Sequence, residues 1–210
     1  MQLYMNPMST YSQKALIALY EKGLPVTLQV LNLRDRAVRQ RYEAHYPLGR
    51  IPMLETDDGQ QIPESSIIIE YLQDHYPSHD PCLIPTEREA ARQVRLLDRL
   101  FDQCLNDAAL TLLHMQLGIR QADERAERKA KKWLAVAYPM LEQALSPGPW
   151  LAGAFSMADC AALPGLYYAR QFLPFDDRPL IADYWQRAQA RPAVAATFAL
   201  ADQAWREQSA

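Results

Sequence analysis

Glu64 and Ser65 stand directly before an apolar helical run, and together they could hold both charges of a zwitterion. The first N–H groups of a helix have no partner within it, and the helix dipole favours negative charge there. With a serine hydroxyl beside them, these groups form a carboxylate site, and a neighbouring glutamate suits an ammonium group. The alternative is an ordinary serine N-cap next to an acidic residue.

Ile51-Pro52, at the start of a short strand, is a candidate peptide-binding segment. A cis peptide bond there would turn the chain so that the N–H and C=O of Ile51 point outward. An extended peptide could then pair with these groups as an added strand. The alternative is a trans proline that simply opens the strand.

The elements that must position these residues lie in the first part of the chain, where short β-rich runs alternate with helical patterns. Asp57-Asp58-Gly59 between two such runs is a strong hairpin signal. The predicted order is βαβαββα, with the first two strands parallel because a helix joins them and the last two antiparallel. The predicted strands cover residues 2–5, 26–31, 53–55 and 61–62, and the predicted helices cover residues 9–22, 34–42 and 65–76.

The remainder of the chain has helical periodicity almost throughout, after a proline-rich segment. We therefore predict an α/β domain over residues 1–77, a linker over 78–86 and an all-helical domain over 87–210. Long helices are predicted over residues 87–117 and 122–145.

A further helix is predicted to begin at Ser156-Met157-Ala158-Asp159. This spacing is that of a capping box, in which the Ser156 hydroxyl and the Asp159 carboxylate satisfy N–H groups that the helix leaves unpaired. We expect these two residues to have a structural role.

The composition excludes several classes of function. The 210 residues include 22 Lys and Arg and 25 Asp and Glu, a net charge of −3, so nucleic-acid binding is not expected. No apolar run is as long as a transmembrane span and no export signal is visible, so we expect no membrane association and a cytoplasmic protein. The 3 cysteines and 4 histidines lack the spacing of a disulfide framework or a metal site, so no metal is expected.

Three segments, in order along the chain, resemble a glutathione transferase: residues 3–14 (LYMNPMSTYSQK), 47–54 (PLGRIPML) and 63–72 (PESSIIIEYL). Residues 155–159 (FSMAD) resemble the buried capping box of that family's helical domain. The resemblance implies a thioredoxin-like N-terminal domain, an all-helical C-terminal domain and a homodimer with a role in detoxification. The arginine-rich helix face from Arg88 to Arg99 is a candidate dimer contact, with a solvated face as the alternative.

The resemblance also implies where the co-substrate glutathione would bind. The γ-glutamyl end would lie at Glu64 and Ser65, and the cysteinyl backbone would pair with Ile51 before a cis Pro52. Arg50 stands where the family often carries a basic residue near the glycyl carboxylate. A small hydrophobic electrophile would bind beside the first and third long helices of the C-terminal domain.

The sequence departs from related patterns at two places. Tyr46 replaces an asparagine that is common in the family's motif. Ser9-Thr10-Tyr11-Ser12 stands where glutaredoxins carry Cys-x-x-Cys, so no thiol remains for disulfide exchange. Conjugation, thiolate addition or peroxide reduction with the sulfur of glutathione is therefore favoured over thiol-reductase activity.

The resemblance places the chemistry at Ser9, at the strand-to-helix turn. A free thiol has a pKa of about 8.5, and lowering it by about 2 units requires about 2.7 kcal/mol of preferential stabilisation. A helix N-terminus supplies roughly 0.3–1 kcal/mol and a charge-assisted hydrogen bond roughly 1.5–3 kcal/mol, so a serine hydroxyl with the dipole is sufficient. A plain N-cap role for Ser9, or another donor such as Ser12, Tyr11 or Tyr4, is the alternative.

The same fold also serves non-enzymatic proteins. Residues 11–12, 76–77, 83–85 and 155–160 also resemble the stringent starvation protein A branch, which works by binding RNA polymerase. Residues 78–81 match the Pro-His-Pro-like turn of that branch only in part. A glutathione-binding carrier or sensor without turnover is a third interpretation. The retained glutathione-site residues favour a transferase.

Overall fold

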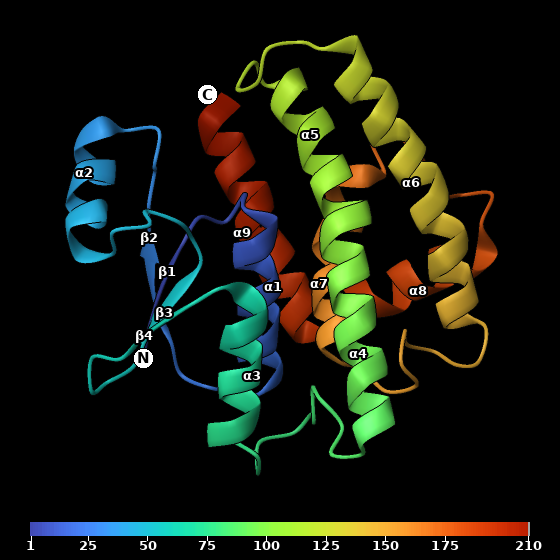
Figure 1. The fold of residues 1–210 in the computed structure, drawn as a ribbon, viewed down its shortest axis with the longest axis horizontal. Coiled ribbons are helices and arrows are strands. Elements are labelled where there is room, and N and C mark those ends of the chain that lie inside the picture. The colour runs from blue at the N-terminus through green and yellow to red at the C-terminus, as the bar shows by residue number, and fades with distance from the viewer. Residues whose placement is uncertain (210) are drawn as a thin grey trace. The chain divides into compact units, whose positions relative to one another are not determined.

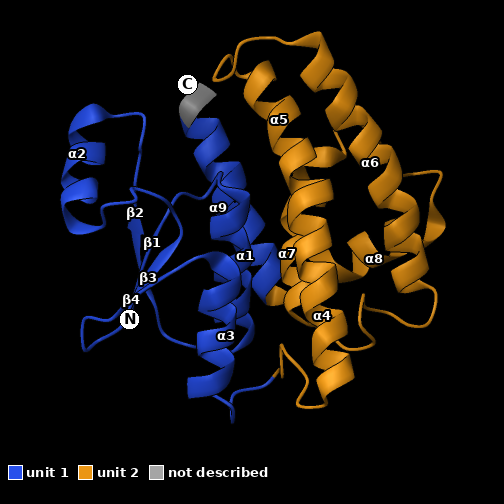
Figure 2. Ribbon diagram, viewed as in Figure 1, with its two compact units in different colours: residues 1–80, 193–210 blue, residues 81–192 orange. Residues whose placement is uncertain are grey.

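The computed structural model describes residues 1–209, which form two compact units (Figure 2). Unit 1 contains residues 1–80 and the C-terminal segment from residue 193, and unit 2 contains residues 81–192. The C-terminal segment, which the sequence-based boundaries place in the helical domain, groups with unit 1 here. No helix in the described part of the chain is both long and apolar enough to cross a membrane.

Unit 1 is built on a 4-stranded sheet with the order β2-β1-β3-β4. β1 (Gln2–Met5) runs parallel to β2 (Thr27–Val30), and it is antiparallel to β3 (Met53–Glu55). β3 is in turn antiparallel to β4 (Gln61–Pro63). The predicted βαβαββα order and the thioredoxin-like N-terminal domain are confirmed.

Helices cover both faces of this sheet. Figure 1 shows α1 (Thr10–Glu21) and α3 (Ser65–His75) on one side and α2 (Arg36–His45) on the other. The apolar run in the middle of α1 is fully buried, and α1 packs against α3. α1 ends where Gly23 adopts a left-handed φ of 61°, a conformation that glycine reaches without steric cost. The last helix is α9 (Pro192–Ser209).

Unit 2 is helical, which confirms the predicted class of the C-terminal domain. The long helix predicted over residues 87–117 is continuous, but its middle part is a π-helical segment, η1. The elements are α4 (Arg88–Leu100), η1 (Phe101–Asn106), α5 (Asp107–Gln116), α6 (Glu124–Leu145), α7 (Met157–Ala169) and α8 (Pro179–Gln189).

α7 approaches η1 closely at a glycine. A Cβ on Gly165 of α7 would stand only 2.9 Å from Cγ of Leu105 in η1, so a larger residue could not occupy this position without a shift. α7 is buried along its whole length, and it packs against α4, η1 and α5. Glycine inside a helix costs about 1 kcal/mol relative to alanine, and close packing of the two helices offsets that cost here.

α7 begins at a capping box whose carboxylate is fully buried. Oδ2 of Asp159 accepts hydrogen bonds from N of Ser156 at 2.8 Å and from Oγ of Ser156 at 3.2 Å. Oδ1 accepts from N of Leu151 at 3.2 Å and from the hydroxyl of Tyr184 at 3.1 Å. One carboxylate thus ties the start of α7 to the preceding loop and to α8.

The stability of the protein is expected to depend on pH through Asp159. Burial raises the pKa of Asp159 from 3.8 to about 6, although its hydrogen bonds act in the opposite direction. Between these values the folded protein holds the proton more tightly than the unfolded chain does. The free energy of unfolding therefore falls as pH rises from about 4 to about 6, by up to about 3 kcal/mol from this group.

The measurement is urea unfolding of the wild type and of Asp159→Asn across pH 4.5 to 7.5. The variant cannot ionise at this position, so its stability deficit relative to the wild type should shrink as pH rises. A stability deficit of Asp159→Asn that does not change with pH would contradict the raised pKa of Asp159.

Candidate functional site

Three chain segments meet at one edge of the sheet in unit 1. Tyr4 pairs with Met53 across β1 and β3, and Met53 pairs with Pro63 across β3 and β4. The end of β1, the start of β3 and the end of β4 therefore share this edge. The segments that follow or precede these strand ends are therefore brought to the same edge. They carry the predicted site residues Ser9, Arg50, Ile51, Pro52, Glu64 and Ser65.

Ser9 is the N-cap of α1. Its Oγ accepts a hydrogen bond from N of Ser12 at 3.4 Å, and its N–H donates to the carbonyl of Asn6 at 2.9 Å. A hydroxyl can accept and donate at once. Within the described residues the Ser9 hydroxyl donates to no protein acceptor. Capping the helix and donating a hydrogen bond to a bound thiolate are therefore compatible roles.

Two of the alternative donors are placed less favourably than Ser9, one by burial and one by the face of the sheet on which it lies. Ser12 is fully buried, and its Oγ accepts a hydrogen bond from N of Asn6 at 3.3 Å. The ring of Tyr4 stacks on Tyr42 of α2 with the centroids 5.6 Å apart, so it faces the side of the sheet opposite α1 (Figure 1). Burial and the nearby charge of Glu55 raise the pKa of Tyr4.

Two hydrogen bonds to its backbone hold the loop that carries Arg50. The hydroxyl of Tyr42 donates to the carbonyl of Arg50 at 2.8 Å, and N of Gly49 donates to the carbonyl of Tyr46 at 2.9 Å. Gly49 has a φ of 58°, in the left-handed region that glycine reaches without steric cost, so this turn favours glycine. Arg50 is exposed.

The Ile51-Pro52 peptide bond is cis, as the interpretation of this segment required. Within the described residues neither the N–H nor the C=O of Ile51 takes part in a backbone hydrogen bond. Its side chain packs on the cluster formed by Tyr42, Tyr46 and Met53. Packing thus fixes the residue while its backbone stays free for an added strand.

Glu64 has a feature that no sequence pattern indicated. Its φ is 69°, in the left-handed region that favours glycine, and strained backbone of this kind clusters at functional sites. No side chain caps the N-terminus of α3, which leaves its first N–H groups available. Nζ of the buried Lys14 donates to Oγ of Ser66 at 2.8 Å, which ties α1 to this end of α3.

Tyr46 directly precedes the segment that carries Arg50 and Ile51. It ends α2 and is only 7% exposed. Burial raises the pKa of Tyr46, the carboxylate of Glu64 raises it further, and the guanidinium of Arg50 lowers it. The phenol therefore lies within electrostatic reach of both charged residues. The replacement of the usual asparagine was the only sequence signal for this position.

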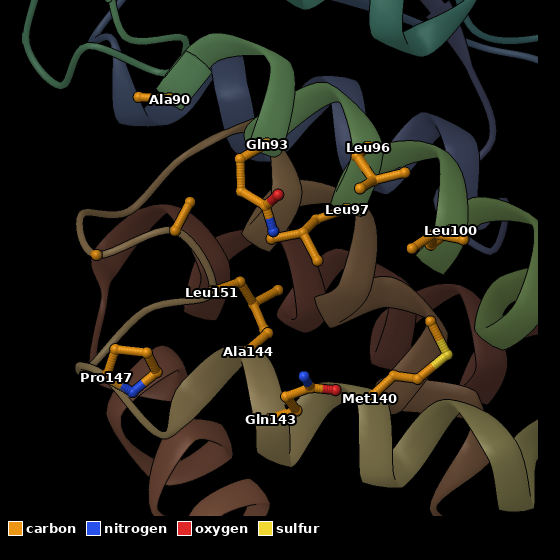
Figure 3. Close-up of a pocket in the computed structure, with 12 residues that line it drawn as sticks. Ala90, Gln93, Leu96, Leu97, Leu100, Met140, Gln143, Ala144, Pro147 and Leu151 are labelled. Atoms are coloured by element: carbon orange, nitrogen blue, oxygen red, sulfur yellow. The ribbon is translucent and has the colours of Figure 1, made fainter.

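Unit 2 contains a cavity of about 520 Å³ between α4, α6 and the loop over residues 147–153 (Figure 3). Its lining is mainly apolar, and the amides of Gln93 and Gln143 are polar groups within it. The volume lies in the range of small-molecule sites. None of the predicted site residues lines this cavity. No cluster of metal-binding side chains occurs within the described part of the chain.

The sequence matches two family descriptions. One is "Glutathione S-transferase, N-terminal domain" over residues 3–81, and the other is "Glutathione S-transferase, C-terminal domain" over residues 88–192. A Pseudomonas aeruginosa protein named maleylacetoacetate isomerase is 32% identical over 151 residues, which are 69% of this chain and 69% of that protein. A Caenorhabditis elegans protein named probable glutathione transferase omega-2 is 35% identical over 141 residues, 65% of this chain and 50% of that protein.

Solved structures show the same similarity. A glutathione S-transferase from Methylobacillus flagellatus with GSH bound has a TM-score of 0.83 and 27% identity, covering 93% of this chain and 98% of that chain. Glutathione transferase F7 from Populus trichocarpa has a TM-score of 0.82 and 26% identity, covering 95% of this chain and 98% of that chain.

Proposed function

Because the chain belongs to the glutathione S-transferase family, we propose that it binds glutathione at the sheet edge of unit 1 and ionises its thiol with the Ser9 hydroxyl. The proposal rests above all on one observation: the segments that carry the Ser9 hydroxyl, the free backbone of Ile51 and the uncapped start of α3 follow or precede strand ends at the same edge. The similar proteins are named as transferases and an isomerase, which does not favour the alternative of an RNA polymerase-binding regulator.

Each part of the tripeptide has a complementary group at this edge. The Ile51 N–H and C=O would pair with the cysteinyl backbone as an added strand. The N–H groups at the start of α3, with Ser65, would hold the γ-glutamyl carboxylate, and Glu64 would face the ammonium group. Arg50 would face the glycyl carboxylate. The thiol would then lie near Ser9, at the N-terminus of α1.

The thiolate formed there is the nucleophile. With an activated aryl halide, the sulfur forms a bond to carbon, the halide leaves with its electron pair, and the thiol proton goes to solvent. With a hydroperoxide, the sulfur takes the terminal oxygen and an alcohol leaves. A second glutathione then completes the reduction as a disulfide and water form. The proposal includes a cytoplasmic homodimer, as the family resemblance implies.

The name of the Pseudomonas relative favours a second candidate reaction, isomerisation of a conjugated maleyl double bond. A thiolate can add to one carbon of such a bond, which allows rotation about the remaining single bond. Departure of the thiolate then restores the double bond in the other geometry. This reaction consumes no glutathione and needs the same activated sulfur.

The reactions are separated by testing the purified protein with an activated aryl chloride, a hydroperoxide and a maleyl ketone, each with and without glutathione. We expect glutathione-dependent turnover of at least one of them. Loss of glutathione during turnover identifies conjugation or peroxide reduction, and turnover without loss identifies isomerisation. Saturable glutathione binding without turnover of any of the three would instead support a carrier or sensor.

Glu64→Gln is expected to weaken glutathione binding about tenfold, because an ammonium-carboxylate hydrogen bond contributes about 1.5–3 kcal/mol and the amide retains only part of it. Isothermal titration measures the effect. The control ligand is glutathione without its α-amino group, which lacks the partner of Glu64. The variant and the wild type should bind this ligand with equal affinity. A tenfold loss with both ligands would show that the substitution acts on the fold of the site.

A further inference from the structure

His45, in the last turn of α2, is fastened to the sheet by contacts with three strands. Nε2 of His45 lies 2.6 Å from Oε2 of Glu55 on β3, and the ring is the donor because an ionised carboxylate only accepts hydrogen bonds. The side-chain amide of Gln61 on β4 donates to the carbonyl of His45 at 3.1 Å. The imidazole also packs on the ring of Tyr4 on β1, with the centroids 5.1 Å apart.

The contact between His45 and Glu55 closes the segment that carries three of the candidate glutathione ligands. Arg50, Ile51 and Pro52 lie between these two residues in the sequence. Glu55 ends β3, which pairs with both β1 and β4, so the sheet holds it in place. Joining the two ends of a segment removes many of the conformations that its middle part could adopt. The contact therefore restricts the segment over residues 46–54.

Within this segment, Arg50 and Ile51 are attached to α2 itself. The hydroxyl of Tyr42, which lies on α2 one turn before the end of the helix, donates to the carbonyl of Arg50 at 2.8 Å. The side chain of Ile51 packs on the cluster that contains Tyr42. A movement of the end of α2 away from β3 would therefore displace Arg50 and Ile51 with it.

We propose that His45 is a positioning residue for glutathione binding: through Glu55 it holds the end of α2, and with it Arg50 and Ile51, in the arrangement that receives the tripeptide. This inference rests on the proposed function, since it requires glutathione at the sheet edge. Only the fraction of molecules that have the segment in place can bind, so a contact that raises this fraction raises the affinity. The side chain of Glu55 is 17% exposed, so water screens this ion pair only in part.

The positioning role concerns binding and not the chemical step. Ser9, which would ionise the thiol, is the N-cap of α1 and lies outside the segment that His45 closes. Loss of the contact should therefore weaken glutathione binding and leave the thiol pKa of the bound ligand unchanged.

The test is His45→Phe, which keeps a ring against Tyr4 and removes the donor to Glu55. We expect the Kd for glutathione in isothermal titration to rise about three- to fivefold, which is about 0.7–1 kcal/mol at about 1.4 kcal/mol per factor of ten. Without ligand, hydrogen exchange of the backbone amides of residues 48–51 should be faster than in the wild type, and saturating glutathione should remove the difference.

Two further variants separate this contact from a general loss of structure. Glu55→Met keeps the length of the side chain and removes the carboxylate, so Glu55→Met, His45→Phe and the double variant should all raise the Kd by the same factor. His75→Phe is the matched control, because His75 lies in the last turn of α3 and its ring stacks on Tyr71 of the same helix. It should leave the Kd unchanged.

A Kd for His45→Phe within about 1.5-fold of the wild type would overturn the inference and leave glutathione binding intact. A raised Kd with unchanged exchange of residues 48–51, or factors that multiply in the double variant, would also overturn it, because the effect would then not come from holding the segment. Failure of the wild type to bind glutathione would overturn the proposed function instead, and the exchange of the ligand-free variants would still show whether the contact holds the segment.

Discussion

Replacing Ser9 with alanine is expected to lower kcat with an activated aryl chloride by about 10- to 100-fold, while the Kd for glutathione changes by less than about threefold. The hydroxyl donates a charge-assisted hydrogen bond to the thiolate, which contributes about 1.5–3 kcal/mol, and each 1.36 kcal/mol is about a factor of ten in rate. The contacts that hold the tripeptide come from other residues, so affinity depends little on Ser9. Steady-state kinetics and isothermal titration measure the two quantities.

Ser9→Thr is the matched control, because threonine keeps both the hydroxyl and the ability to cap α1. It should retain most of the activity that Ser9→Ala loses. The pH dependence of the rate should also shift to higher pH in Ser9→Ala, because the thiol of bound glutathione then ionises closer to its free pKa. An equal loss in kcat and in glutathione affinity would assign Ser9 to binding only.

Replacing Asp159 with alanine is expected to lower the free energy of unfolding by about 3–5 kcal/mol. The substitution removes a carboxylate that accepts hydrogen bonds from the backbone of Leu151 and Ser156 and from the hydroxyls of Ser156 and Tyr184. Asp159 is 0% exposed and Ser156 is 2% exposed, so water cannot replace the lost acceptor. Urea unfolding with an unchanged m-value measures the effect.

Asp123→Ala is the matched control. Asp123 caps α6 by accepting hydrogen bonds from N of Arg125 and N of Ala126, but it is exposed, so its loss should cost about 1 kcal/mol. Tyr184→Phe removes one donor to Asp159 without removing the acceptor, and it should also cost about 1 kcal/mol. A loss of stability for Asp159→Ala no larger than that for Asp123→Ala would contradict the structural role of the buried capping box.

The fold of unit 1 was predictable because its signals are local. Asp57-Asp58-Gly59 fixes the hairpin between β3 and β4, and Gly23 fixes the end of α1. The capping box at Ser156 is likewise a pattern of near neighbours. The π-helical turn η1 gave no such signal, because it occurs where α7 packs against the helix through Gly165, and this contact joins residues far apart in the sequence.

The segments of the candidate site were predictable from the sequence, but their arrangement in space was not. The register that pairs Tyr4 with Met53, and Met53 with Pro63, decides which strand ends meet, and no single segment contains that information. The left-handed φ of Glu64 and the packing of Tyr46 with Tyr42 and Met53 likewise depend on tertiary structure. The sequence showed only that Tyr46 departs from a common pattern.

The central claim is that glutathione binds at the sheet edge as a thiolate. Its most direct test is the ultraviolet absorbance of the thiolate in the complex of the wild type with glutathione, followed across pH. The account predicts a thiol pKa about 2 units below the free value of about 8.5, and a smaller shift in Ser9→Ala. Saturable binding with an unshifted thiol pKa would contradict it.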